Sequence, residues 1–321
     1  MARWRSPISA RWRGGALPAW LAVAFALNVL ALRMPFMDLR KGLSTSPYSL
    51  QASVEFLWES GLYVLAIVVV AFSVLFPFVK LGVLGAVLIG ALPEARERRA
   101  LEFVERYGKW SMLDVFLVCI MLALANDQFF IDATPRGGLL CFTAAILTSM
   151  ATSGRMLARL QRLDPPVTRT GQRSRWRTLA QTVLFGLLVL VIAVPYLEID
   201  DWRLDDHPVS LVSTIADLWR SGARSLAALA TVFLALAPLA AAGAAVAISR
   251  RVNRGQDPHA LERFAHFARH WAMLDVFALA LGIFLVEGRE FVRTELSWGA
   301  FLLALMLLVY WPTSNWLSRR A

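Results

Sequence analysis

The chain has 321 residues, of which 58% are hydrophobic and only 17% are charged, and its mean hydropathy is +0.56. A soluble globular protein carries about 25% charged residues, so the composition excludes that class and predicts a protein that folds in a lipid bilayer. The formal net charge of +10 would suit a nucleic-acid-binding protein, but the distribution of the charge along the chain argues against that partner.

Hydropathy predicts eight transmembrane helices, and hence an all-α integral membrane protein. A helix needs about 20 residues to cross a bilayer, within a range of about 17–25. The third and seventh segments are at the short end of this range, and the second is longer than needed. In chain order, the predicted spans are 18–32, 61–92, 111–126, 137–154, 179–197, 222–249, 271–286 and 298–316.

Lys and Arg are distributed unevenly between the segments that connect these spans. If the N-terminus is cytoplasmic, the cytoplasmic stretches hold 23 of the 33 basic residues and the opposite stretches hold 8. Such a bias sets the orientation of a membrane protein, so both termini are expected in the cytoplasm. The excess of basic residues is then explained by the orientation of the chain in the membrane, and nucleic acid is not expected as a partner.

The two halves of the chain are related by a fixed offset of 161 residues. KWSMLDVF at 109–116 matches HWAMLDVF at 270–277, and LWESG at 57–61 matches LWRSG at 218–222. Matches of Trp and Asp in constant register indicate an internal duplication. Each repeat holds four spans, and because four is even, both repeats enter the membrane from the same side. The fold is therefore predicted as two parallel four-helix repeats.

The repeat sets the expected domain boundaries. The domains are a cytoplasmic tail at 1–17, the first repeat at 18–154, a cytoplasmic linker at 155–177, the second repeat at 178–316 and a C-terminal cytoplasmic tail at 317–321. An amphipathic helix with Trp58 is expected before the second span, and one with Trp219 before the sixth. Because Trp favours the boundary of water and lipid, both helices are expected to lie in the membrane interface.

A proline lies near the middle of the second span, and its copy lies in the sixth. The segment 61–92 would be ~48 Å long as one helix, well beyond the hydrocarbon core of ~30 Å. Pro77 and Pro238 each remove a backbone hydrogen bond and are expected to kink their helices. Kinks at matching positions of two halves point to a transport site. The alternative is a tilted helix that continues into the cytoplasm.

Lys80 follows Pro77 by three residues and lies inside the same span. A lysine in a span costs about 2.5–3.5 kcal/mol, and such residues usually face a bundle interior or a cavity. The alternative is a lysine without a specific function whose side chain snorkels to the membrane interface. Lys80 lies ~20 Å along the helix from its cytoplasmic end at Pro93, which is deep for such a side chain. Its copy is Ala241, so the charge is asymmetric. A functional role is expected for Lys80.

The repeated motif places an aspartate at the start of an apolar run. Ser111 and Asp114 fit the pattern of a capping box, and an acid in the first turn is favoured by the helix dipole. In the copy, Ser111 is replaced by Ala272 while the acid remains as Asp275. A capping box therefore does not explain the second aspartate.

Trp110 shares a helix face with Asp114, as Trp271 does with Asp275. Asp114 is expected about one turn inside the cytoplasmic boundary, where it would approach Lys80 in the inner leaflet. Since the second repeat has no lysine at the equivalent position, a scaffolding role is expected for Asp275.

Four stretches carry a resemblance to a known family. PFMDLRKG follows the first span, VEFLWESG precedes the second, FPFVK lies within the second, and KWSMLDVF opens the third. Together they resemble the paraquat-inducible protein A family over almost the whole chain. The resemblance implies an inner-membrane protein of Gram-negative bacteria that works with MCE-domain proteins, which form tunnels across the periplasm, in moving lipids between the two membranes. It also implies that Lys80, Ser111 and Asp114 are polar positions of the transmembrane core.

The chain departs from the family in its cytoplasmic segments. Many members carry cysteine-rich, zinc-ribbon-like segments before each repeat, whereas 1–17 and 155–177 contain no cysteine. We therefore expect no zinc and no other cofactor.

The expected function is that of the inner-membrane component of an MCE-type lipid-transfer system, which exchanges phospholipid with a periplasmic MCE-domain partner. No GxxxxGK[ST] motif occurs, so energy would come from an ion gradient, from a separate ATPase or from neither. A proton route through Asp114 and Lys80 is one hypothesis. The alternatives are a non-transporting anchor or assembly factor for the partner, and a membrane-stress protein. A lipid-modifying enzyme is not expected, because the spans hold no nucleophile with a base.

Overall fold

The structure is a computed structural model that describes residues 16–41, 44–59, 61, 63–125, 131–161, 175–199, 207–287 and 294–319. Most of the expected N-terminal tail, residues 162–174 of the expected linker and the last two residues lie outside these ranges. The chain divides into two compact units, Met1–Val118 with Gln128–Pro165, and Cys119–Asp127 with Pro166–Ala321.

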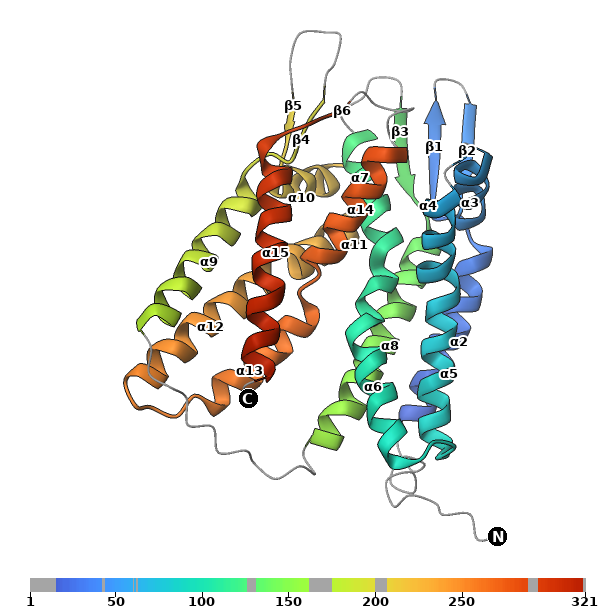
Figure 1. The fold of residues 1–321 in the computed structure, drawn as a ribbon. Helices are drawn as coiled ribbons and strands as arrows, with labels where there is room; N and C mark the ends of the chain where they lie inside the picture. Colours follow the sequence, from blue (N-terminus) through green and yellow to red (C-terminus); the bar gives the residue numbers. More distant parts are fainter. Residues whose placement is uncertain are drawn as a thin grey trace, which may run out of the picture. The chain divides into compact units, whose positions relative to one another are not determined.

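Most of the first repeat that the structure describes is helical. Its elements are α2 (Leu17–Arg33), α3 (Leu50–Glu59), α4 (Tyr63–Val69), the π-helix η1 (Val70–Leu75), α5 (Phe76–Ile89), α6 (Glu94–Gly108), the 3₁₀-helix η2 (Lys109–Met112), α7 (Leu113–Ala125) and α8 (Gly137–Gln161). Figure 1 shows α5 and α6 side by side and antiparallel, with α6 continuing upward into α7. The third span is thus not preceded by a loop, because only η2 separates α7 from α6.

The second repeat has the same order of helices. They are α9 (Arg175–Ala193), α10 (Leu211–Arg220), α11 (Arg224–Ala230), the π-helix η3 (Thr231–Leu236), α12 (Ala237–Asn253), α13 (His259–Trp271), α14 (Leu274–Glu287) and α15 (Trp298–Arg319). The amphipathic helices expected before the second and sixth spans are present as α3 and α10, and the indoles of Trp58 and Trp219 are exposed.

Within the described residues, five helical segments are long and apolar enough to cross a membrane. They are Ala66–Ile89, Gly137–Met156, Arg175–Ala193, Arg224–Asn253 and His259–Leu285. Two shorter apolar helices are Leu17–Arg33 and Trp298–Leu308. The chain is therefore a multi-pass membrane protein, and the count of eight spans stays a prediction. The candidate span from His259 begins well before residue 271, where the seventh span was predicted.

Two small antiparallel sheets were not predicted, so the all-α assignment is incomplete. The first has the order β2-β1-β3 and consists of β1 (Met37–Lys41), β2 (Ser44–Tyr48) and β3 (Ile131–Pro135). The second has the order β5-β4-β6 and consists of β4 (Leu197–Ile199), β5 (His207–Val209) and β6 (Thr294–Leu296). In each repeat the central strand follows the first helix, and one neighbour precedes the last helix. Met37 pairs with both Tyr48 and Pro135.

Both helices in which kinks were predicted contain a π-turn. The Phe76 amide donates to Ala71 O, and the Ala237 amide donates to Val232 O, so each bond reaches five residues back. Pro77 and Pro238 follow directly and lack an N–H, which removes the donor that would restore ordinary α-helical bonding. A π-turn before a proline is one of the known causes of an irregular helix, and such turns are frequent at functional sites.

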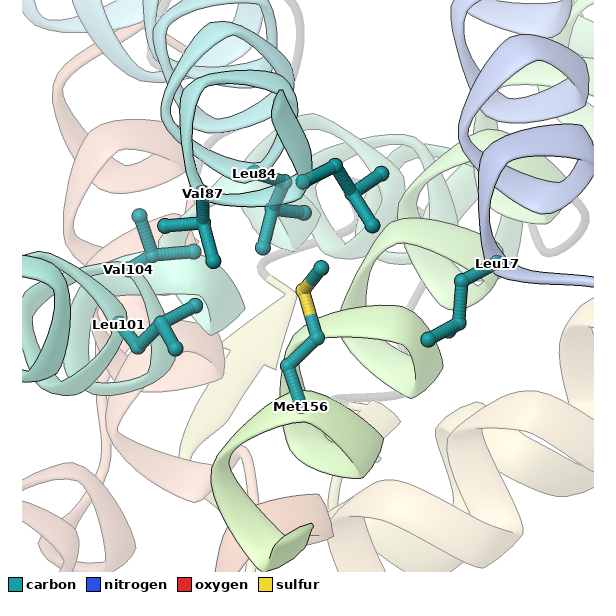
Figure 2. Packing of buried hydrophobic residues seen from close by; sticks show 7 residues of the cluster. Leu17, Leu84, Val87, Leu101, Val104 and Met156 are labelled. Carbon is teal, nitrogen blue, oxygen red and sulfur yellow. The ribbon is translucent and has the colours of Figure 1, made fainter. Parts of the chain in front are cut away.

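A core of apolar side chains joins four helices of the first unit. Its members, from α2, α5, α6 and α8, are Leu17, Leu84, Val87, Leu88, Leu101, Val104 and Met156. Figure 2 shows the Met156 side chain projecting among its neighbours, with Leu17 on one side and Leu101 on the other. This core fixes the lower part of the hairpin that α5 and α6 form.

Candidate functional site

A buried polar stripe follows the second span of the first repeat. Ser73 lies in the π-turn, Pro77 lies four residues on, and Lys80 three residues after that, so the three share a helix face. The Lys80 side chain is 1% exposed and Ser73 is equally buried. Leu84 continues the same face into the apolar core. The sequence prediction that Lys80 faces the protein interior is consistent with this burial, and a snorkelling side chain is not.

The Lys80 ammonium lies against Gly108, at the C-terminal end of α6. A Cβ atom built on Gly108 would be 3.0 Å from Lys80 Nζ and 3.4 Å from Lys80 Cε. The missing side chain of Gly108 therefore makes the room that the ammonium occupies. The C-terminal end of a helix carries a partial negative charge, which favours a cation there. Nζ nevertheless makes no hydrogen bond to the part of the chain that the structure describes.

Asp114 lies in the first turn of α7, immediately after η2, and is 3% exposed. The Ser73 hydroxyl of the facing π-turn is close enough to interact with the Asp114 carboxyl, but no hydrogen bond of normal geometry joins them. The oxygens Ser73 Oγ, Ser111 Oγ and Asp114 Oδ2 are all buried and have no hydrogen-bond partner among the described residues. The hairpin of the second and third spans thus encloses one carboxyl oxygen and two hydroxyls that make no hydrogen bond to the residues that the structure describes.

The capping box considered for Ser111 is not formed, since its hydroxyl makes no hydrogen bond to the residues that the structure describes and Ser111 itself lies in the 3₁₀-turn. Lys80 and Asp114 also do not form a direct ion pair. We call Lys80, Ser111, Ser73 and Asp114 the polar seam. At one end Lys80 lies beside Gly108, and at the other Asp114 lies beside Ser73. Ser111 lies between Gly108 and Asp114 on the chain.

Trp110 and Trp271 have the same neighbour in their two repeats. The Trp110 ring is 5.8 Å from the Phe72 ring, and the Trp271 ring stacks on Phe233 at 5.5 Å and an interplanar angle of 11°. Both phenylalanines belong to the π-turns. Each tryptophan lies at the helix break before the third span of its repeat. It packs there against the π-turn in the second span of the same repeat.

The second repeat closes the same junction with a backbone bond. The Phe233 carbonyl would find its π-helical donor at residue 238, which is Pro238 and has no N–H. It instead accepts a hydrogen bond from the Met273 amide at 3.1 Å. Met273 is free to donate because α13 ends at Trp271 and Ala272 is extended. Among the described residues, no such bond joins Phe72 and Met112, the equivalents in the first repeat.

Asp275 is half-buried, less than its twin Asp114. It lies near the middle of the candidate span His259–Leu285, whereas the sequence placed it at a membrane boundary. Sequence reasoning missed two members of the site. Ser73 was detectable as a hydroxyl in an apolar run four residues before a proline, but Gly108 carried no local signal.

Comparison with known proteins identifies the family. The model of the family described as paraquat-inducible protein A matches the chain twice, over residues 16–161 and 174–321. The chain belongs to the paraquat-inducible protein A family. The two matches correspond to the two repeats, so the family model describes one repeat, and the duplication inferred from the sequence is confirmed. No solved structure matches the chain.

Characterised members of the paraquat-inducible protein A family include the intermembrane transport protein PqiA of Escherichia coli K12 and that of Shigella flexneri. Each is 29% identical to the chain over 137 residues, which is 41% of this chain and 33% of the relative. The match thus spans about a third of the length of each relative.

Proposed function

We propose that the chain is the inner-membrane component of an MCE-type lipid-transfer system, exchanging phospholipid between the membrane and a periplasmic MCE-domain protein. Membership of a family whose relatives are named intermembrane transport proteins supports this role. The proposal includes eight spans in two parallel repeats, with both termini in the cytoplasm of a Gram-negative bacterium.

The observation that carries the proposal is the buried polar seam from Lys80 to Asp114. Charged groups within a membrane are costly and are retained where they serve a pathway or a relay. These two groups flank a π-turn and a 3₁₀-turn that face each other, and irregular helices at membrane depth are typical of transport sites. The hydroxyls of Ser73 and Ser111, which make no hydrogen bond to the described residues, add polar groups to the seam between the two charges. We propose that this seam moves a proton and that the movement drives lipid transfer.

The test uses the full chain reconstituted in proteoliposomes with its MCE-domain partner, and follows the transfer of a fluorescent phospholipid. Lys80→Ala and Asp114→Asn should each lower the initial rate at least about tenfold, which corresponds to a rise of about 1.4 kcal/mol in the activation free energy of transfer. Exposed residues supply matched controls, Arg98→Ala for the lysine and Asp257→Asn for the aspartate, and both should transfer at the wild-type rate. Normal transfer by both Lys80→Ala and Asp114→Asn would end the proton-route proposal.

The competing proposal is a non-transporting anchor that only recruits the partner. It predicts that Lys80 and Asp114 variants transfer lipid normally per complex formed, and that changes in the outer segments 33–60 and 198–221 abolish the complex. Co-purification of the partner, measured beside transfer, separates the two functions.

A further inference from the structure

Positions 80 and 108 exchange their residue types between the repeats. The offset of 161 residues places Ala241 at the position of Lys80 and Arg269 at the position of Gly108. In the first repeat the cation comes from α5 and the small residue from α6. In the second, the small residue is on α12 and a cation is on α13. The two positions face each other in the first repeat, since Lys80 Nζ lies 3.0 Å from where a Gly108 Cβ would be.

The surroundings of Arg269 fit this exchange. α12 and α13 pack along each other, and Ala241 is 1% exposed. Arg269 is half-buried, and its Nε atom is buried without a hydrogen-bond partner among the described residues. An arginine that only sets the topology of a loop would be exposed, as Arg263 is on the same helix. Arg269 therefore carries part of its charge into the hairpin.

The spacing to the aspartate is also the same. Gly108, against which the Lys80 ammonium lies, precedes Asp114 by six residues, and Arg269 precedes Asp275 by six residues. A helix break lies between them in both repeats, η2 in the first and the extended Ala272 in the second. In both repeats, a cation that is at least partly buried and an aspartate would then lie on either side of a helix break.

We propose that Arg269 is the functional counterpart of Lys80, so that the second repeat holds its own cation–aspartate site with Asp275. This proposal differs from the scaffolding role expected for Asp275, which rested on the absence of a lysine at position 241. The role of Arg269 in lipid transfer rests on the proposed function, whereas its place in the hairpin does not.

The place of the charge is tested by moving it between helices. Ala241→Lys puts a second cation opposite Arg269, and like charges in one buried site repel. Thermal unfolding of the purified protein in detergent should show a midpoint lower by about 5 °C or more. The double variant Ala241→Lys/Arg269→Gly restores the arrangement of the first repeat and should recover most of that loss. If the midpoint of the double variant is lowered by the sum of the losses in Ala241→Lys and Arg269→Gly, the inference is overturned.

The role of the charge is tested in the lipid-transfer assay. Arg269→Ala should lower transfer about as strongly as Lys80→Ala, Arg263→Ala should leave it unchanged, and Ala241→Lys/Arg269→Gly should transfer faster than Arg269→Gly alone. If Arg269→Ala transfers normally while Lys80→Ala does not, the inference fails and the proposed function stands. If neither variant affects transfer, the inference and the proton route fail together, whereas a wild-type protein that transfers no lipid would end the proposed function. Circular dichroism and gel filtration of Arg269→Ala show whether a loss of transfer comes from misfolding, and a misfolded variant is replaced by Arg269→Gln.

Discussion

Gly108 borders the Lys80 ammonium, which lies where a side chain at residue 108 would begin. A methyl group at residue 108 would meet Nζ at 3.0 Å, closer than ordinary packing allows. The placement of a buried charge in this protein thus depends on a residue that has no functional group.

Gly108→Ala is expected to destabilise the protein by about 1–3 kcal/mol, the usual cost of overpacking a filled site, and to lower lipid transfer by displacing the ammonium. Chemical unfolding and the transfer assay measure the two effects. Gly82→Ala is the matched control, since a Cβ atom there meets nothing within 4 Å. A Gly108→Ala protein as stable and as active as Gly82→Ala would show that the ammonium does not depend on this space.

At this scale the sequence predicted the charges and missed their neighbours. Lys80 and Asp114 were found because an ionisable residue in an apolar run is conspicuous. Their direct approach was not found in the structure, and the contacts of Lys80 with Gly108 and of Asp114 with Ser73 were not expected. Such contacts join separate helices, and neither hydropathy nor a local motif determines which residues meet across a hairpin.

At the scale of elements, the π-turn is the feature that distinguishes the second span. It holds one more residue per turn than an α-helix, so the helical phase after it is offset by about 100°. Pro77 maintains the offset, because it cannot donate the bond that would close an α-turn. Pro77 therefore helps to set the face that α5 turns towards α6.

Pro77→Ala supplies the missing N–H and should allow η1 to return to α-helical geometry. Because the apolar core fixes α5, the change should rotate α4 and bury a side chain at residue 67, which is 60% exposed in the native chain. Oxygen accessibility of a spin label at 67 measures the rotation, and a label at 89, beyond the proline and equally open, is the control. An unchanged accessibility at 67 would mean that tertiary packing, not proline, holds the π-turn.

The helices were largely predictable and the strands were not. Apolar runs gave α2 to within one residue and the start of α8, whereas α8 continues seven residues beyond the predicted span and α9 lies four residues earlier than predicted. The proline indicated a disturbed second span. The strands hold only three to five residues each, so even where apolar and polar residues alternate, as in LEI at 197–199, the pattern is too short to indicate a strand. They form because segments distant in sequence are brought together at the same end of the unit.

On the scale of the whole molecule, each unit ties its first helix to its last. In the first unit β1 pairs with β3, which directly precedes α8, and the Arg136 amide donates to Phe36 O at 2.8 Å. A Cβ atom on Gly138 would lie 2.5 Å from Pro35 O, so the two chain segments meet at backbone distance. The second unit repeats the joint, with the Gly299 amide donating to Pro195 O at 3.1 Å.

Gly138→Ala should therefore be poorly tolerated, because backbone atoms cannot move aside as a flexible side chain does. A loss of at least about 1–3 kcal/mol is expected, seen as a lower unfolding midpoint and reduced yield of folded protein. Gly137→Ala places its Cβ atom 3.6 Å from a Met34 methyl, an ordinary contact, and should be tolerated. Equal stability of the two variants would contradict the close joint.

The features shared by the two repeats also record the order in which the protein evolved. The π-turn before a proline, the three-stranded sheet and the glycine at the joint occur in both halves, so the ancestral half already had them when its gene was duplicated. The exchange of Lys80 and Gly108 for Ala241 and Arg269 must have followed. Both copies thus kept the helix geometry of the ancestral unit, whereas the helix that carries the cation differs between them.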